Sequence, residues 1–340
     1  MARHAVADAR ATGIPFVAGA SRERDRPRAR TGADGAALRE FAELAPFVAD
    51  PGVTDVFVTG GSVWVDRGSG AERVALTLEP ERCRALATSL VALGARHVDD
   101  ATPVVDVRLH DGIRVHAVLP PIAVGGAQLS IRLPRVEALS LAQLEVGGVF
   151  EAVPLAQVLA LVRRRANVLV TGAGGSGKTT LLAAMLSEAG ARERIVTIED
   201  VAELRIRHPH VVALEARQAN AEGAGEIGLA RLVREALRMR PDRLVLGECR
   251  GAEVRELLAA LNTGHDGGAG TLHANSLDDV PARLEALGAL AGLAPAALAR
   301  QAVSAIDAVL HVERTGEGMR RVAAVGRLAL EGDRLAVERA

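Results

Sequence analysis

The sequence predicts an α/β protein in two parts, a small α+β module followed by a larger domain with a mainly parallel sheet. Between 36 and 133, short strand-like runs surround one longer helical pattern, whereas from about 146 strand-like runs alternate with helical patterns. Such alternation is typical of a parallel sheet with helices on its faces. The chain has 340 residues, of which 49% are hydrophobic, and this is enough material for about two packed domains.

The first part consists mainly of short β-type segments. Residues 36–50 fit a short amphipathic helix, and 80–95 fit a second one with Leu86, Leu90 and Leu93 on one side. Strands are expected at 55–58, 63–65, 103–108, 114–119 and 129–132. The organisation that we expect is a disordered basic tail over 1–30, an α+β domain over 31–133 and a linker over 134–145.

The second part, 146–340, contains the alternating pattern. Strands are expected at 167–171, 194–199, 243–247 and 271–273, with helices at 179–188, 230–240 and 252–261. The helix over 230–240 has the clearest apolar periodicity, and Pro241 ends it. Because the carboxyl ends of parallel strands converge on one crevice, residues that follow these strands are candidate site residues.

Charge and composition disfavour several classes of protein. The formal net charge is −1 and only 2% of the residues are aromatic, which argues against wrapping nucleic acid or stacking its bases. Cys83 and Cys249 are far apart and form no Cys-x-x-Cys pair, so neither a zinc ribbon nor a disulfide framework is expected. The sequence shows no run of 18 apolar residues and no secretory signal, so we expect a cytoplasmic protein.

The chain contains 40 arginines but a single lysine, Lys178. This lysine lies in Gly-Ala-Gly-Gly-Ser-Gly-Lys-Thr, which fits the phosphate-loop pattern Gly-x-x-x-x-Gly-Lys-Ser/Thr between a strand and a helix. The glycines let backbone N–H groups turn toward phosphate oxygens, and the following helix adds positive charge at its start. Lys178 is expected to bind the β- and γ-phosphates, and Thr179 to bind Mg²⁺. The predicted nucleotide-binding residues of this loop are Gly172, Ala173, Gly174, Gly175, Ser176, Gly177, Lys178, Thr179 and Thr180.

Acidic residues end two of the expected strands. Glu199 and Asp200 follow the strand 195–198, and Glu248 ends the hydrophobic strand 244–247. Hydrolysis of a nucleotide needs a carboxylate near the γ-phosphate, and these three side chains are expected to face the nucleotide. A helix cap or a solvated turn is the alternative interpretation of Glu199 and Asp200.

Two histidines, His265 and His273, lie eight positions apart in a glycine-rich stretch. A metal site is one interpretation, although the sequence offers no third ligand at the usual spacing and Mg²⁺ prefers oxygen. The other interpretation is a loop that senses the γ-phosphate, with His273 as its main residue.

Taken together, these motifs resemble the secretion-system ATPases shared by type II secretion, type IV secretion and type IV pili, and most closely the tight-adherence pilus branch. The similarity covers roughly 38–330. The segments that carry it look like the family's Walker A motif, Asp box, atypical Walker B motif and His box in family order: 172–179, 197–200 with 203–204, 236–251, and 262–267 with 271–276.

The resemblance implies a RecA-like P-loop domain, with the nucleotide held between it and the N-terminal domain. It implies a homohexameric ring that hydrolyses ATP with Mg²⁺ on the cytoplasmic face of the inner membrane. A platform protein in that membrane would be its partner, and no direct nucleic-acid contact is expected.

Specific roles follow for matching residues. Arg114 and Arg132 look like the arginines that reach the phosphates from the N-terminal domain, although surface ion pairs are the alternative. Glu199 would support Mg²⁺ through water and Glu248 would activate the attacking water, but which of the two is the base stays open. His273, with His265, would report the state of the γ-phosphate.

Two other functions compete with this interpretation. One is a RecA-like or conjugative nucleic-acid translocase, which the neutral charge and the low aromatic content disfavour. The other is a regulator that binds a nucleotide without hydrolysing it, and the presence of Glu248, Glu199 and Arg132 argues against it.

Overall fold

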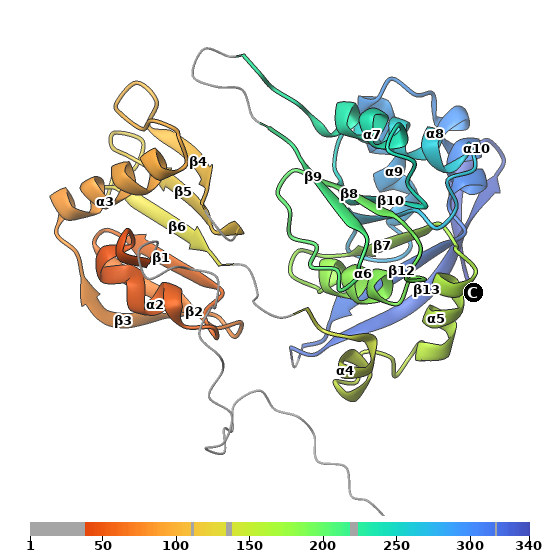
Figure 1. The fold of residues 1–340 in the computed structure, drawn as a ribbon, viewed down its shortest axis with the longest axis horizontal. Helices are drawn as coiled ribbons and strands as arrows, with labels where there is room; N and C mark the ends of the chain where they lie inside the picture. Colours follow the sequence, from red (N-terminus) through yellow and green to blue (C-terminus); the bar gives the residue numbers. More distant parts are fainter. Residues whose placement is uncertain (1–37, 110–111, 134–137, 218–223, 317) are drawn as a thin grey trace, which may run out of the picture.

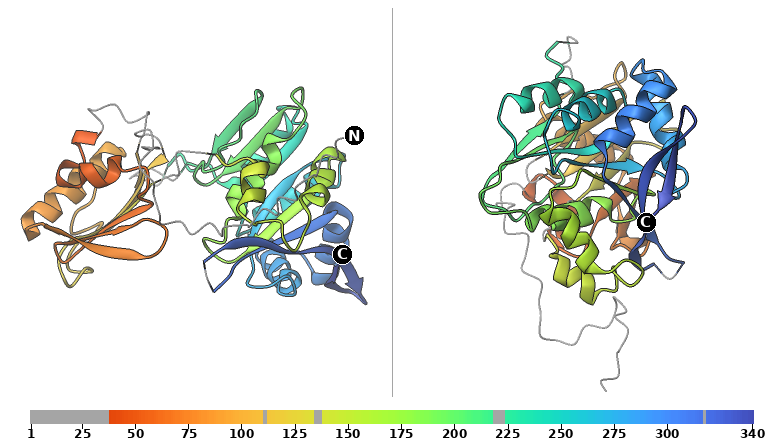
Figure 2. Two further views of the ribbon diagram at one scale, coloured as in Figure 1. Left: turned by 90° about the horizontal axis from the view of Figure 1, so that it is seen from below. Right: turned by 90° about the vertical axis from the view of Figure 1, so that its right-hand side faces the viewer.

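The computed structural model describes residues 38–109, 112–133, 138–217, 224–316 and 318–340, and the predicted tail at 1–30 lies outside them. The chain forms two lobes, each built on its own sheet (Figure 1). Figure 2 shows the same two lobes from two further sides. The predicted α/β class is confirmed, and the larger sheet is mainly parallel as expected.

The first lobe has a six-stranded antiparallel sheet in the order β3-β2-β1-β6-β5-β4. Its strands are β1 (Asp55–Thr59), β2 (Ser62–Asp66), β3 (Ala71–Thr77), β4 (Val104–Arg108), β5 (Arg114–Val118) and β6 (Gln128–Arg132). All of these except β3 were predicted. Its helices are η1 (Ala42–Leu44), α2 (Ala45–Ala49) and α3 (Pro80–Leu93). The helical pattern at 36–50 is divided because Pro46, in the first turn of α2, cannot donate a helical hydrogen bond.

The two faces of this sheet differ because strand residues alternate in direction. One face packs against α3, where Val115 and Ile131 join Leu86 and Leu90 in a core. The residues between them on β5 and β6 point to the other face. That face carries Arg114, which is in register with Arg132.

The second lobe has an eight-stranded sheet in the order β14-β13-β12-β7-β11-β10-β8-β9. The six strands from β12 to β9 are parallel, and the last two strands add an antiparallel hairpin at one edge. The strands are β7 (Val168–Gly172), β8 (Ile195–Glu199), β9 (Val211–Glu215), β10 (Arg243–Cys249), β11 (Ala269–His273), β12 (Ala308–Arg314), β13 (Arg320–Glu331) and β14 (Arg334–Arg339).

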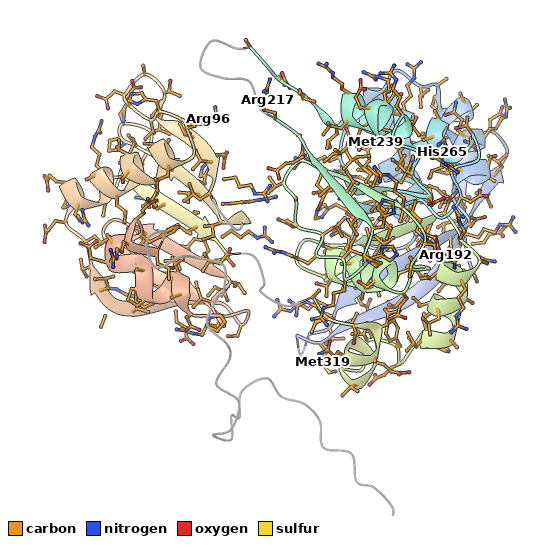
Figure 3. All side chains as sticks on the ribbon, in the orientation of Figure 1. Arg96, Arg192, Arg217, Met239, His265 and Met319 are labelled. Atoms are coloured by element: carbon orange, nitrogen blue, oxygen red, sulfur yellow. The ribbon has the colours of Figure 1, made fainter. Side chains whose placement is uncertain are left out.

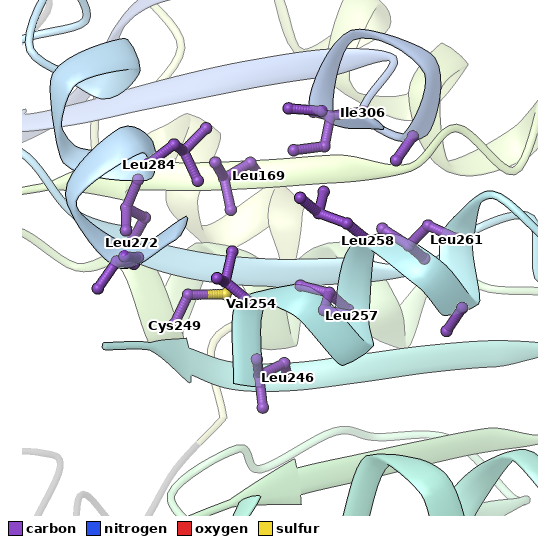
Figure 4. Close-up of a cluster of buried hydrophobic side chains, with 14 of the residues drawn as sticks. Leu169, Leu246, Cys249, Val254, Leu257, Leu258, Leu261, Leu272, Leu284 and Ile306 are labelled. Carbon is purple, nitrogen blue, oxygen red and sulfur yellow. The ribbon is translucent and has the colours of Figure 1, made fainter. Parts of the chain in front are cut away.

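Helices cover both faces of this sheet. The helices are α4 (Leu141–Val146), α5 (Leu155–Arg163), α6 (Lys178–Ser187), α7 (Leu229–Leu237), α8 (Glu253–Leu261), α9 (Val280–Leu290) and α10 (Pro295–Ala305). Val168 and Val170 of β7 pack on the side of α4 to α6, whereas Leu169 packs on the side of α7 to α10. Figure 4 shows this second core, in which Leu257 of α8 lies over the sheet.

One predicted boundary differs from the structure. The first four residues of the segment after Leu133, 134–137, lie outside the described part, but α4 (Leu141–Val146) begins within the predicted linker 134–145. The signal for this helix is a capping box: the Ser140 hydroxyl accepts from the Gln143 N–H, and the Gln143 side chain accepts from the Ser140 N–H.

No single helix among the described residues is long and apolar enough to cross a membrane. The pair α9 and α10 would pass by length and composition, but the two helices meet at a bend of 119°.

Candidate active site

The candidate site lies where β7, β8, β10 and β11 end. These strands are parallel neighbours, and His273 is directly in register with Gly172 at the end of β7. Glu199 ends β8, and Glu248 lies one residue before the end of β10. The structure therefore brings the phosphate loop, two carboxylates and one histidine to one edge of the sheet.

The phosphate loop needs glycine at two positions for different reasons. A Cβ at Gly172 would lie 2.1 Å from the Val312 carbonyl oxygen, so no side chain fits there. Gly177 has φ of 102°, in the left-handed region that favours glycine, and it leads directly into α6. A glycine-rich loop that leads directly into a helix is suited to bind phosphate through backbone N–H groups and the positively polarised start of the helix.

The ammonium of Lys178 is held inside this loop. Its Nζ donates to the carbonyl oxygens of Gly172 (3.0 Å) and Ala173 (2.8 Å) and lies 3.5 Å from Nδ1 of His273. Burial lowers the pKa of Lys178, and the nearby charge of Glu248 opposes this shift. The one lysine of the chain is thus placed where phosphate oxygens would meet it.

His273 connects Lys178 to Glu248. Its Nδ1 faces the lysine, and its Nε2 lies 3.1 Å from Oε1 of Glu248. Burial and then the charge of Lys178 lower the pKa of His273, which favours the neutral ring near neutral pH. With the proton assigned to Nε2 from these partners, the ring accepts from the lysine and donates to the carboxylate.

Glu199 is buried at the end of β8, the strand that pairs with β10, which carries Glu248. Its Oε1 accepts from the backbone N–H groups of Glu203 (2.9 Å) and Leu204 (3.0 Å). Burial raises the pKa of Glu199, and these two hydrogen bonds oppose the rise. Space for the side chain comes from Gly247 on β10, because a Cβ there would lie 2.5 Å from Cγ of Glu199.

These residues fit a nucleotide with Mg²⁺. Oε2 of Glu199 and Oγ of Ser176 are buried, and neither has a hydrogen-bond partner among the described residues. Thr179 is half-buried in the first turn of α6, next to Lys178. Hydroxyl and carboxylate oxygens are the donors that Mg²⁺ prefers, and a phosphate or a metal-bound water would satisfy the two buried atoms.

The remaining predicted residues have different positions. Thr180 is half-buried in the first turn of α6, and Asp200 makes an ion pair with Arg250 after β10. His265 is not brought to the loop: it precedes β11 and lies near α8 (Figure 3), with Nδ1 3.2 Å from the Ala260 carbonyl oxygen. The length of β11 separates it from His273, a span of about 15 Å, so the two histidines do not come together, and the nucleotide-binding role of His265 stays a prediction.

Arginines of the first lobe contact the loop that follows Glu199. Arg114 makes an ion pair with Glu203 at 3.0 Å, and Arg108 pairs with Glu215 and donates to the Ala202 carbonyl oxygen. Arg132 is exposed, and its side chain has no hydrogen bond or ion pair to another described residue. The predicted phosphate contacts of Arg114 and Arg132 remain predictions.

Sequence reasoning missed residues from β12 and β13 that support the loop. Nδ1 of the buried His311 lies 3.0 Å from Oγ1 of Thr171, and its ring also bonds the backbone of Asn275. Arg320 donates from Nε to the Gly175 carbonyl oxygen at 3.2 Å. Neither belongs to a recognisable motif, and each becomes adjacent only through the order of strands in the sheet.

Solved structures support the fold. The pilus retraction motor PilT with bound ADP aligns with a TM-score of 0.58 and 23% identity, over 89% of this chain and 82% of that one. The ATPase DotB of Legionella pneumophila aligns with a TM-score of 0.58 and 20% identity, over 87% of this chain and 82% of that one.

Sequence comparisons identify the family. A Mycobacterium tuberculosis protein named for conjugal transfer is 51% identical over 290 residues, which are 83% of this chain and 82% of that protein. The type IV secretion system protein PtlH of Bordetella pertussis is 35% identical over 311 residues, 82% of this chain and 91% of that protein. A family model described as type II/IV secretion system protein matches residues 38–315. The chain therefore belongs to the type II/IV secretion system protein family.

Proposed function

We propose that this secretion ATPase is a ring-forming motor whose ATP hydrolysis at 172–179 powers a membrane-bound export or pilus machine. The observation that carries the proposal is the series Lys178, His273 and Glu248, in which successive groups are 3.5 Å and 3.1 Å apart. It links a phosphate-binding cation to a carboxylate that can act on water.

The residues divide the chemical work as follows. Lys178 and the N–H groups of the loop bind the β- and γ-phosphates, and Thr179, with Glu199 through water, holds Mg²⁺. When bound, Mg²⁺ would neutralise charge that develops on the phosphates. Glu248 orients the attacking water or removes its proton. His273 contacts both Lys178 and Glu248, so the position of Glu248 depends on what Lys178 contacts.

Steady-state ATP hydrolysis tests this assignment. We expect K178A and E248Q to lose activity by a factor of about 100 or more, because each removes a group that acts on the phosphates or the water. E199Q should also lose activity. H265N is the matched control and should retain activity within about twofold, because His265 lies at the other end of β11. Full turnover by K178A or E248Q would contradict the proposal.

The assembly is a further part of the proposal. We infer a homohexamer that contacts a platform protein on the cytoplasmic face of the inner membrane, within a machine of the tight-adherence pilus type. Relatives named for conjugal transfer and for type IV secretion support a role in a transfer machine. Neighbouring genes for a pilin and a polytopic membrane protein are the expected observation, and neighbours for a different transfer system would contradict the pilus assignment.

A nucleic-acid translocase is the function from another class to be tested against the motor. The expected result is that single- or double-stranded DNA leaves the ATPase rate unchanged. Strong stimulation by DNA, absent in a K178A control, would favour the translocase.

A further inference from the structure

Arg320 occupies the outer side of the phosphate loop. It is the first residue of β13, and its Nε donates to the Gly175 carbonyl oxygen at 3.2 Å. Its stem covers Gly177, because a Cβ built there would lie 3.1 Å from Cδ of Arg320. One side chain therefore touches both the middle and the end of the loop.

A chain of hydrogen bonds leads from Arg320 to Lys178. In a trans peptide, the carbonyl of one residue and the N–H of the next point in opposite directions. The Gly175 carbonyl faces Arg320, and the Ser176 N–H donates to the Ala173 carbonyl oxygen at 3.3 Å. The same oxygen accepts from Nζ of Lys178 at 2.8 Å. The guanidinium of Arg320 thus fixes the orientation of the peptide between Gly175 and Ser176. The N–H on the inner side of this peptide and Nζ of Lys178 share one acceptor, the Ala173 carbonyl oxygen.

Two further arginines lie close to Arg320 in the sheet. Arg314 of β12 is directly opposite Arg320 in the antiparallel register. The next residue, Arg321, points to the other face of β13 and pairs with Glu313 at 2.8 Å.

We propose that Arg320 is a positioning residue for nucleotide binding: by holding the Gly175 carbonyl outward, it orders the loop and Lys178 to receive the phosphates of ATP or ADP. The proposal rests on the proposed function, since it requires the loop to bind a nucleotide. Because ordering the loop helps the bound substrate and the transition state equally, its loss should change affinity more than turnover.

The test compares R320A with R321A, which removes the neighbouring arginine from the other face. We expect R320A to raise the KM for ATP and the Kd for ADP about tenfold, as for loss of a hydrogen bond from a charged donor, with kcat within about threefold of wild type. R321A should stay within about twofold for all three values. R320K, which keeps the stem and the charge, should fall between R320A and wild type. Melting temperatures without ligand check that the variants are folded.

Several outcomes would overturn the proposal. One is an unchanged KM for ATP and Kd for ADP in R320A. The other is an equal loss of nucleotide affinity in R321A, which would indicate a general effect of positive charge. If R320A does not fold, R320M replaces it, because its stem still covers Gly177; wild-type affinity in R320M would then refute the proposal. A wild-type chain that binds no ATP or ADP would refute the proposed function itself, and this inference with it.

Discussion

At the scale of single residues, the buried position of Glu199 reduces the stability of the folded chain. It is buried, Oε1 has two backbone donors, and Oε2 has no partner among the described residues. Burial of a charge with incomplete hydrogen bonding disfavours the ionised form, and this explains the raised pKa. Cost of this kind is typical of functional sites, where a group is placed for chemistry and not for stability.

This gives a prediction for E199Q in buffer without nucleotide or metal ion. Because burial raises the pKa of Glu199 in the folded chain above its usual value in an unfolded chain, the folded chain binds this proton more tightly than the unfolded chain does. Below the unfolded value, the wild type keeps the full benefit of the protonated group. As the pH rises through the folded pKa, the wild type loses this stability, whereas glutamine does not titrate.

The melting temperature of E199Q should therefore exceed that of the wild type at about pH 8, and the difference should shrink toward acid pH. Each kcal/mol gained would raise the melting temperature by about 2–4 °C in a domain of about 150–250 residues. E248Q is the control, since Glu248 is half-exposed, and its melting temperature should rise little above that of the wild type. A difference for E199Q that is constant across the pH range would contradict this explanation.

At the scale of elements, β8 and β10 share the space that Glu199 needs. The two strands are parallel neighbours, with Leu246 in register with Ile198, so Gly247 comes beside Glu199. The absence of a side chain at Gly247 leaves room for Cγ of the glutamate, 2.5 Å from where a Cβ would stand. The glycine in β10 thus makes room for a side chain of the neighbouring strand β8.

G247A should consequently displace Glu199 and lower kcat. Misplacement of a catalytic group by about 1 Å can cost about 100-fold, so we expect a loss of tenfold or more. G228A is a matched control, because a Cβ at Gly228 meets no atom within 4 Å and its backbone is extended. ATPase assays of both variants measure the effect, and equal activity of the two would show that β10 tolerates the methyl group.

The same elements show how much the sequence can predict. The strand, loop and helix around Lys178 are predictable because contiguous residues define them, and β8 and β10 are predictable from their apolar runs. His311 and Arg320 are not, since each meets its partner across 140 or more positions, at a register that only the assembled sheet determines. The distance between His265 and His273 could not be predicted either, because spacing along the chain does not reveal which end of β11 a residue occupies.

At the scale of the whole molecule, the loop after β8 joins the two lobes to the site. Glu199 holds this loop through the N–H groups of Glu203 and Leu204. Arg114 of the first lobe binds the Glu203 carboxylate, and Arg108 donates to the Ala202 carbonyl oxygen. Glu199 at the candidate site and the two arginines of the first lobe therefore contact one short segment, through which a change on either side can reach the other.

Charge reversal tests whether these contacts hold the lobes together. R114E should place two acids against each other and open the molecule, which small-angle X-ray scattering would record as a larger radius of gyration. The double variant R114E/E203R restores an ion pair of opposite polarity and should return the radius toward that of the wild type.

R84E is the matched control, because Arg84 pairs with Asp100 within the first lobe. Since a half-exposed pair contributes only about 0.2–1 kcal/mol, the effect should be a severalfold shift between closed and open forms and not unfolding. An equal radius for R114E and R84E would mean that this pair does not hold the lobes together, whereas failure of E203R to restore R114E would indicate that Arg114 acts on another partner.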